Sequence, residues 1–319
     1  MLTRRRFIIS SAMLGSALLV PKLRANASSS SSHKRNRKRA SGGSGIGPQA
    51  VIPGGTLNPT TITKYADPLV VPPSMPKISV ITGKNGESID YYEIAVRQFE
   101  QQILPAVNFG TTTVWSYGSV GQEPEHAETF NYPAFTIEGQ VNRPIRVKWI
   151  NDLKGPDGKF LPHLFAIDQT LHWANPGGGE MMRDHRGEQS ATPYTGPVPL
   201  VTHVHGAHTH EESDGFSEAW YLPDANDIPA GFAEVGSHYD EFKQKAEARH
   251  GQTWTRGSAV FEYPNNQRAG TNWYHDHAIG MTRNNVYAGP AGFFILRGGS
   301  DDLQDGSLPA GKYEVPIAV

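Results

Sequence analysis

The chain has 319 residues, enough for one large domain or two ordinary ones. It contains no cysteine, which excludes disulfides, a thiolate nucleophile and any cysteine-ligated metal centre. Glycine (34 residues) and proline (24 residues) are abundant and long helical patterns are scarce, so an all-β fold is favoured. The net charge is −2, but no Asp or Glu precedes Asp67. Beyond residue 27 the chain carries 24 Lys and Arg against 31 Asp and Glu, a composition poorly suited to binding nucleic acid.

The first 27 residues have the pattern of an export signal. Residues 3–7 (TRRRF) match a twin-arginine motif, an apolar run follows over 7–20, and the sequence Ala-Asn-Ala at 25–27 has the form of a cleavage site. The apolar run is shorter than the ~20 residues that cross a bilayer. We therefore predict a twin-arginine signal peptide, a periplasmic or extracellular protein and no stable membrane span, with an uncleaved anchor as the alternative.

Residues 28–64 predict a disordered linker, because a serine run, a cluster of basic residues and a Gly/Ser/Pro tract follow one another without apolar periodicity. The basic cluster suits either a solvated tail, which we favour, or contact with nucleic acid or anionic lipid.

Residues 65–319 predict a single β domain. Ile145, Val147 and Trp149 alternate with charged residues, which is typical of a half-buried strand. Similar patterns predict strands at 91–99, 111–117, 135–138, 143–151, 200–206, 258–263, 271–277 and 291–296, and the start of another at 313. The strands at 258–263 and 271–277 are expected to form a hairpin. The charged segment 224–256 is expected to be an insertion on the rim, with a helix at 239–249. Without alternating strands and helices, the expected fold is an antiparallel Greek-key sandwich or barrel with long rim loops.

Two histidine doublets of the form H-x-H carry the functional signal. His203 and His205 lie in one predicted strand, and His275 and His277 lie in another. Residues i and i+2 of a strand share a face, so each doublet presents two imidazoles on one side. Four imidazoles on neighbouring strands suit Cu, Zn, Fe or Ni, and this chemistry alone does not choose among them. We predict these four histidines to be metal ligands.

The other histidines are expected to be structural. His208 and His210 also form an H-x-H pair, but we place them in the rim loop that follows the first doublet. Five others lack a partner at ligand spacing and are expected to be ordinary surface or loop residues: His163, His172, His185, His238 and His250.

The segments around the doublets, VTHVHGAHTHEESDGFSEAW (201–220) and YPNNQRAGTNWYHDHAIGMTRNNVYAGPAGFFIL (263–296), resemble the first cupredoxin domain of multicopper oxidases. The likeness is strongest to the bacterial branch of spore-coat laccase, bilirubin oxidase and phenoxazinone synthase, and it extends over about 65–319. It implies a plastocyanin-like domain of an oxidoreductase. Such an enzyme oxidises a small reducing substrate and reduces dioxygen to water at a cluster of three copper ions.

The resemblance also implies a role for each site residue. His203 matches a ligand of the type 2 copper, and His205, His275 and His277 match ligands of the type 3 pair. Asp214 matches an acidic residue that handles protons near the cluster, as O–O cleavage consumes protons. The family's type 1 copper needs a cysteine thiolate, which this chain lacks. We therefore expect an N-terminal fragment that supplies half of the cluster ligands, with the chain ending where the missing second domain begins.

Three interpretations remain open at this stage. The chain is part of a copper oxidase completed by C-terminal cupredoxin domains, or a stand-alone module that binds Cu or Zn without turnover, or a truncated product that folds poorly and exposes an apolar patch.

Overall fold

The structure is a computed structural model and describes residues 56–186, 192–303 and 306–317. The predicted signal peptide and most of the predicted linker lie outside these residues. The chain divides into two units, Met1–Asn58 and Pro59–Val319, and the second contains every element described below. Within the described ranges, no helix is long and apolar enough to cross a membrane.

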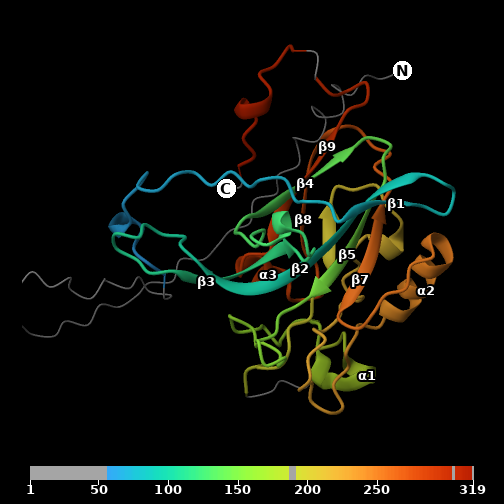
Figure 1. Ribbon diagram of the computed structural model, residues 1–319. Coiled ribbons are helices and arrows are strands. Elements are labelled where there is room, and N and C mark those ends of the chain that lie inside the picture. Colours follow the sequence, from blue (N-terminus) through green and yellow to red (C-terminus); the bar gives the residue numbers. More distant parts are fainter. Residues whose placement is uncertain (1–55, 187–191, 304–305, 318–319) are drawn as a thin grey trace, which may run out of the picture. The chain divides into compact units, whose positions relative to one another are not determined.

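Two β-sheets form the second unit (Figure 1). The first sheet has the order β1-β2-β5-β7, with β3 also paired to β2, and the second has the order β4-β9-β8-β6. The strands of the first sheet are β1 (Ser79–Thr82), β2 (Ser88–Gln101), β3 (Thr112–Ser119), β5 (Ile145–Asn151) and β7 (Ser258–Tyr263). Those of the second are β4 (Ala134–Gln140), β6 (Thr202–His205), β8 (Gly270–Asp276) and β9 (Ala291–Arg297).

The expected all-β, cupredoxin-like sandwich with long rim loops is confirmed. The expectation that all its strands are antiparallel is wrong, because β2 pairs with β5, and β4 with β9, in parallel. Parallel neighbours need long connections between them. Here the connections cross from one sheet to the other, which the strand patterns alone do not reveal.

Two further expectations fail. β7 and β8 are not a hairpin, because β7 pairs with β5 in the first sheet and β8 pairs with β6 and β9 in the second. Asn265 explains the crossing: its backbone is left-handed (φ 54°) and its side-chain amide donates to the Arg143 carbonyl at 2.8 Å, which turns the chain away from β7. The strand expected from residue 313 is also absent from the described residues, where Gly311–Tyr313 forms a 3-10 turn and 314–317 has no strand.

Aromatic side chains join the two sheets beneath the histidines. Trp149 of β5 is buried, and its ring lies 5.4 Å from those of both Tyr117 and Tyr274, which belong to β3 and β8. The Trp149 indole donates to the Tyr263 hydroxyl at 3.1 Å, so its polar atom is satisfied. This cluster fixes the distance between the sheets and supports β8 from below.

In the part of the chain that the structure describes, three short α-helices accompany the sheets: α1 (Gly179–Met182), α2 (Tyr239–His250) and α3 (Thr282–Tyr287). The helix expected at 239–249 is therefore confirmed as α2, which lies beside β7 in Figure 1. Tyr239, Phe242 and Ala246 are its buried residues. The helix ends at Gly251, which is left-handed (φ 68°) and donates its N–H to the Glu247 carbonyl at 2.9 Å.

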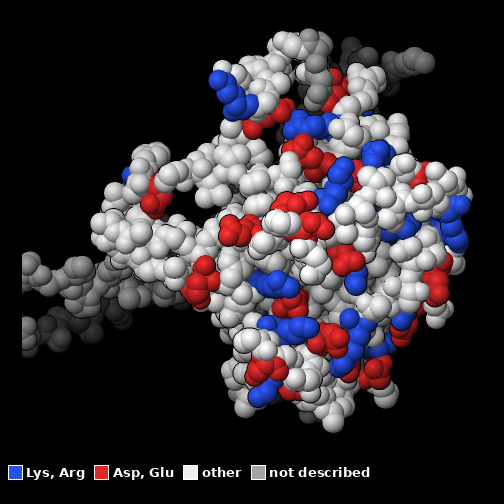
Figure 2. All heavy atoms as spheres, viewed as in Figure 1, with Lys and Arg blue, Asp and Glu red and all other residues white. Residues whose placement is uncertain are grey.

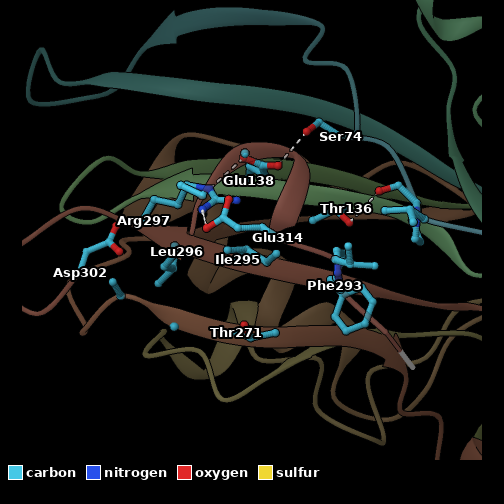
Figure 3. Close-up of a pocket in the computed structure, with 18 of the residues that line it drawn as sticks. Ser74, Thr136, Glu138, Thr271, Phe293, Ile295, Leu296, Arg297, Asp302 and Glu314 are labelled. Carbon is cyan, nitrogen blue, oxygen red and sulfur yellow. Dashed lines mark hydrogen bonds and ion pairs between the residues drawn. The ribbon is translucent and has the colours of Figure 1, made fainter. Parts of the chain in front are cut away.

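A groove of about 1000 Å³ lies over the outer face of β4 and β9 (Figure 3). Arg297 lies within it, paired with Glu138 and with Glu314, both at 3.1 Å, and Ser74 donates to Glu138 at 2.9 Å. The ion pair between Arg297 and Glu314 therefore attaches the segment after residue 310 to β9, where a strand had been expected. On the face shown in Figure 2, acidic and basic side chains are intermixed, without a large field of one sign.

Candidate metal centre

The two histidine doublets lie on neighbouring antiparallel strands. In the register of β6 and β8, His203 is directly opposite His275, and His205 is opposite Trp273. His277 follows β8, and its backbone N–H donates to the Val201 carbonyl at 2.8 Å, which continues the pairing. The antiparallel ladder thus brings residues some seventy positions apart in sequence into direct contact.

The four imidazoles face one another. The ring centroid of His203 lies 5.6 Å from those of His205 and His275 and 4.8 Å from that of His277. His203, His205 and His275 each offer a ring nitrogen, and these three nitrogens lie within 4.8 Å of one another. His277 is not in that tighter group, although its ring is the one nearest to His203. The predicted residues are therefore brought together, three as a ready ligand set and the fourth beside it.

The hydrogen bonds of the rings leave nitrogens free for a metal. His203 Nδ1 donates to the Asp214 carbonyl, and His275 Nδ1 donates to the Asp276 carbonyl at 2.7 Å. These bonds fix the neutral tautomers whose Nε2 lone pairs point away from the backbone. His275 Nε2 and His277 Nδ1 are buried and have no hydrogen-bond partner among the described residues. A buried acceptor without a partner costs about 1–3 kcal/mol. Coordination would satisfy both, so these residues fit a metal ion that imidazole prefers.

The pKa values of the rings also favour metal binding. The pKa of His275 is lowered to about 4: burial is the largest cause, the bond to Asp276 opposes the shift, and the neighbouring histidines add to it. Burial likewise lowers the pKa of His277. Burial acts in the same sense on His203, but hydrogen bonds and charge from Asp214 outweigh it and raise its pKa. At neutral pH the His275 and His277 rings are therefore uncharged, as a metal ligand must be.

Asp214 is placed at the edge of the cluster. Its carboxylate Oδ1 lies 3.5 Å from His203 Nδ1, and about half of its side chain is exposed. It therefore contacts a predicted ligand and solvent at the same time, as a group that passes protons to the cluster would have to.

Asp276 lies on the opposite side of β8 from its two histidine neighbours. Its carboxylate is fully buried and accepts hydrogen bonds from the Val201 N–H at 3.0 Å, the Ala278 N–H at 3.2 Å and the Asn285 amide at 3.0 Å. These bonds attach β8 to the start of β6. Asp276 therefore holds the two doublets in register and does not face the metal centre, as the alternation of a strand predicts.

Gly215 brings the loop after Asp214 against β6. Its φ is +76°, and a Cβ there would collide with the Thr202 carbonyl oxygen. We expect Gly215→Ala to lower the free energy of unfolding by about 2 kcal/mol or more, because backbone strain and the collision add. Urea unfolding measures the loss. Gly231→Ala is the matched control, since Gly231 has φ +84° and open space around it. Equal losses in the two variants would contradict the close approach.

The residues that support the loop containing Asp214 and Gly215 were not predicted from the sequence. Glu212 is buried beside Arg249 and His250, although His250 was expected to be an ordinary surface or loop residue. The run Glu-Glu-Ser-Asp directly before the loop is the only sequence signal that marks it. His208 and His210, in contrast, are exposed as expected.

Comparison with known proteins extends these findings. Laccase from Bacillus subtilis is 30% identical over 262 residues, which cover 81% of this chain and 38% of the laccase. Laccase from Haloferax volcanii is 30% identical over 86% of this chain and 38% of its own length. Among solved structures, a multicopper oxidase from Pediococcus acidilactici aligns with 16% identity and a TM-score of 0.45, covering 78% of this chain and 33% of that one. No family model matches the chain.

The chain is an all-β sandwich of the cupredoxin class, and its facing imidazoles on paired strands could hold a metal ion. The chain belongs to the multicopper oxidase family. Copper is accordingly its cofactor, as expected from the resemblance of its histidine segments. The chain spans 38% of the length of the Bacillus and Haloferax laccases.

Proposed function

We propose that this chain is the N-terminal cupredoxin domain of a laccase-like multicopper oxidase and holds one side of its copper cluster. The observation that carries the proposal is the nitrogen group of His203, His205 and His275, with His275 Nε2 buried and unpartnered. In this assignment His203 binds the type 2 copper, and His205, His275 and His277 bind the type 3 pair. Copper supplies the redox chemistry by which electrons from a small reducing substrate reduce dioxygen to water.

The residues of the chain have their own tasks in this proposal. The Asp214 and Asp276 carbonyls hold the His203 and His275 rings with Nε2 directed at the cluster. Trp273 lies against His275 with ring centroids 4.0 Å apart, so it restricts rotation of that ligand and limits water around it. The half-exposed Asp214 carboxylate takes a proton from solvent and holds it at Oδ1, within reach of the cluster.

The boundaries and location belong to the same proposal. Residues 1–27 are a twin-arginine signal that exports the protein, residues 28–64 are a linker, and 65–319 form the cupredoxin domain. C-terminal cupredoxin domains supply the other cluster ligands and the type 1 copper, which requires a cysteine that this chain does not have.

A copper titration tests the site. Native mass spectrometry of the wild-type chain with Cu²⁺ is expected to show bound copper, and His203→Ala and His275→Ala are each expected to lose it, because each removes one nitrogen of the group. His208→Ala is the control, since His208 is exposed and outside the group. Unchanged copper stoichiometry in both site variants would overturn the assignment.

The absence of cysteine favours a second candidate, a module that binds Cu or Zn without turnover. Oxygen consumption with a phenol separates the two functions. The oxidase proposal expects consumption once the chain is combined with a polypeptide that carries the remaining cupredoxin domains and their copper. If the chain is a metal-binding module, it is expected to bind copper or zinc and to consume no oxygen, either alone or combined with that polypeptide.

A further inference from the structure

The loop that orients the His203 ring is anchored far from it, on β7. The short helix η5 (Glu211–Ser213) precedes Asp214 and runs along this strand. Ser213 is buried, and its hydroxyl accepts the Glu262 N–H at 3.0 Å. The Thr209 hydroxyl donates to the Glu262 carbonyl at 2.9 Å. Side chains of the loop therefore satisfy backbone groups of β7 on the edge that no strand covers.

Helix α2 holds the same loop through two of its side chains, those of Arg249 and His250. Arg249 Nε donates to Glu212 Oε1 at 2.6 Å, and His250 Nε2 lies 3.5 Å from the same oxygen. The Glu212 side chain has no exposed surface, and its second oxygen is buried without a partner. A buried carboxylate is costly unless it is paired. Glu212 can therefore occupy this position only while Arg249 and His250 of α2 remain in contact with it.

The other end of the loop reaches the metal centre. The Asp214 carbonyl accepts the hydrogen bond of His203 Nδ1, and Gly215 follows directly after Asp214. Only one residue separates Glu212 from Asp214, and the left-handed Gly215 leaves the loop no space to shift against β6. A movement at Glu212 is therefore transmitted to the Asp214 carbonyl, which orients the His203 ring.

We propose that Glu212 is a positioning residue of the copper centre: its buried contact with Arg249 and His250 of α2 holds the loop that orients His203. This inference rests on the proposed copper site. It adds Glu212 to that site, together with Arg249 and His250, which lie more than thirty positions after Glu212 in the sequence. The neighbouring Glu211 does not share the role. It is exposed and pairs with Lys245 at the surface, where ion pairs contribute little.

Two measurements on Glu212→Gln test the proposal. Removing a partner that orients a metal ligand lowers metal affinity by about 10–100-fold. The variant is therefore expected to bind Cu²⁺ about 10-fold more weakly than the wild type, as measured by competition with a chelator. In the copper-free chain, the His203 Nδ1 proton is expected to give a protected imidazole resonance by NMR, and to exchange faster with water in the variant. Glu211→Gln is the matched control and is expected to leave both measurements unchanged.

The NMR measurement keeps this proposal separate from the proposed function. If the wild-type chain binds no copper, the copper function fails, while the exchange rate of the His203 proton still decides the positioning role. Arg249→Gln provides a second variant from the exposed side of the contact and is expected to change both readouts in the same direction. The proposal is overturned if Glu212→Gln folds with an unchanged proton exchange rate, if the wild-type proton is unprotected, or if both variants fail to fold.

Discussion

Glu262→Gln is expected to lower the free energy of unfolding by about 3 kcal/mol at pH 7, because it leaves the Arg146 guanidinium buried without its counter-charge. Only 4% of the Arg146 side chain and 9% of the Glu262 side chain are exposed, and Arg146 donates to Glu262 Oε2 at 2.9 and 2.5 Å. Urea unfolding of the two proteins measures the difference. Arg268→Gln is the control, since its pair with Asp301 lies at the surface and its loss is expected to cost under about 1 kcal/mol.

The ion pair of Arg146 and Glu262 also predicts how the difference in unfolding free energy between wild type and Glu262→Gln changes with pH. Burial raises the pKa of Glu262, but hydrogen bonds and charges from His250 and Arg146 outweigh it and leave the pKa below its usual value of 4.5. A carboxylate with a lowered pKa stabilises the fold above pH 4.5, and this contribution disappears as the pH falls through the folded-state pKa. The difference in unfolding free energy between wild type and Glu262→Gln is therefore expected to become smaller below pH 4.5. A gap that widens on acidification would contradict this account.

Trp149→Ala is expected to destabilise the fold by about 4 kcal/mol, because it opens a cavity between the two sheets and removes a hydrogen bond to Tyr263. Trp149→Phe serves as the graded control. It keeps most of the packing against Tyr117 and Tyr274 and is expected to lose roughly half as much stability. Chemical unfolding followed by circular dichroism measures both. Similar losses in the two variants would show that cavity volume does not dominate at this position.

Strand positions were largely predictable, whereas strand pairing was not. β5 and β7 follow from alternation and β-branched residues, which are local properties of the chain. The parallel pairing of β2 with β5 and the crossing after β7 depend on contacts between distant segments, such as the bond from Asn265 to Arg143. Local patterns carry no information about these contacts, which explains why the hairpin at β7 and β8 was predicted wrongly.

The part of the site that was predictable is the part that follows from the alternation of side chains along a strand. The H-x-H spacing placed His203 and His205 on one face, and the register of β6 and β8 brought His203 opposite His275. The support by Glu212 could not be anticipated in the same way. Its partners lie on a helix more than thirty residues later, and only burial distinguishes it from its exposed neighbour.

The second sheet also constrains when the metal site can form during synthesis. Among the described strands, β6 pairs with β8 alone, β8 also pairs with β9, and β9 also pairs with β4. β4 ends at Gln140 and β9 begins at Ala291, so the whole stretch between them must be synthesised before this sheet is complete. Such distant pairing is typical of high contact order and slow folding. The nascent chain therefore has to remain unaggregated, with its two histidine doublets unpaired, until β9 has emerged.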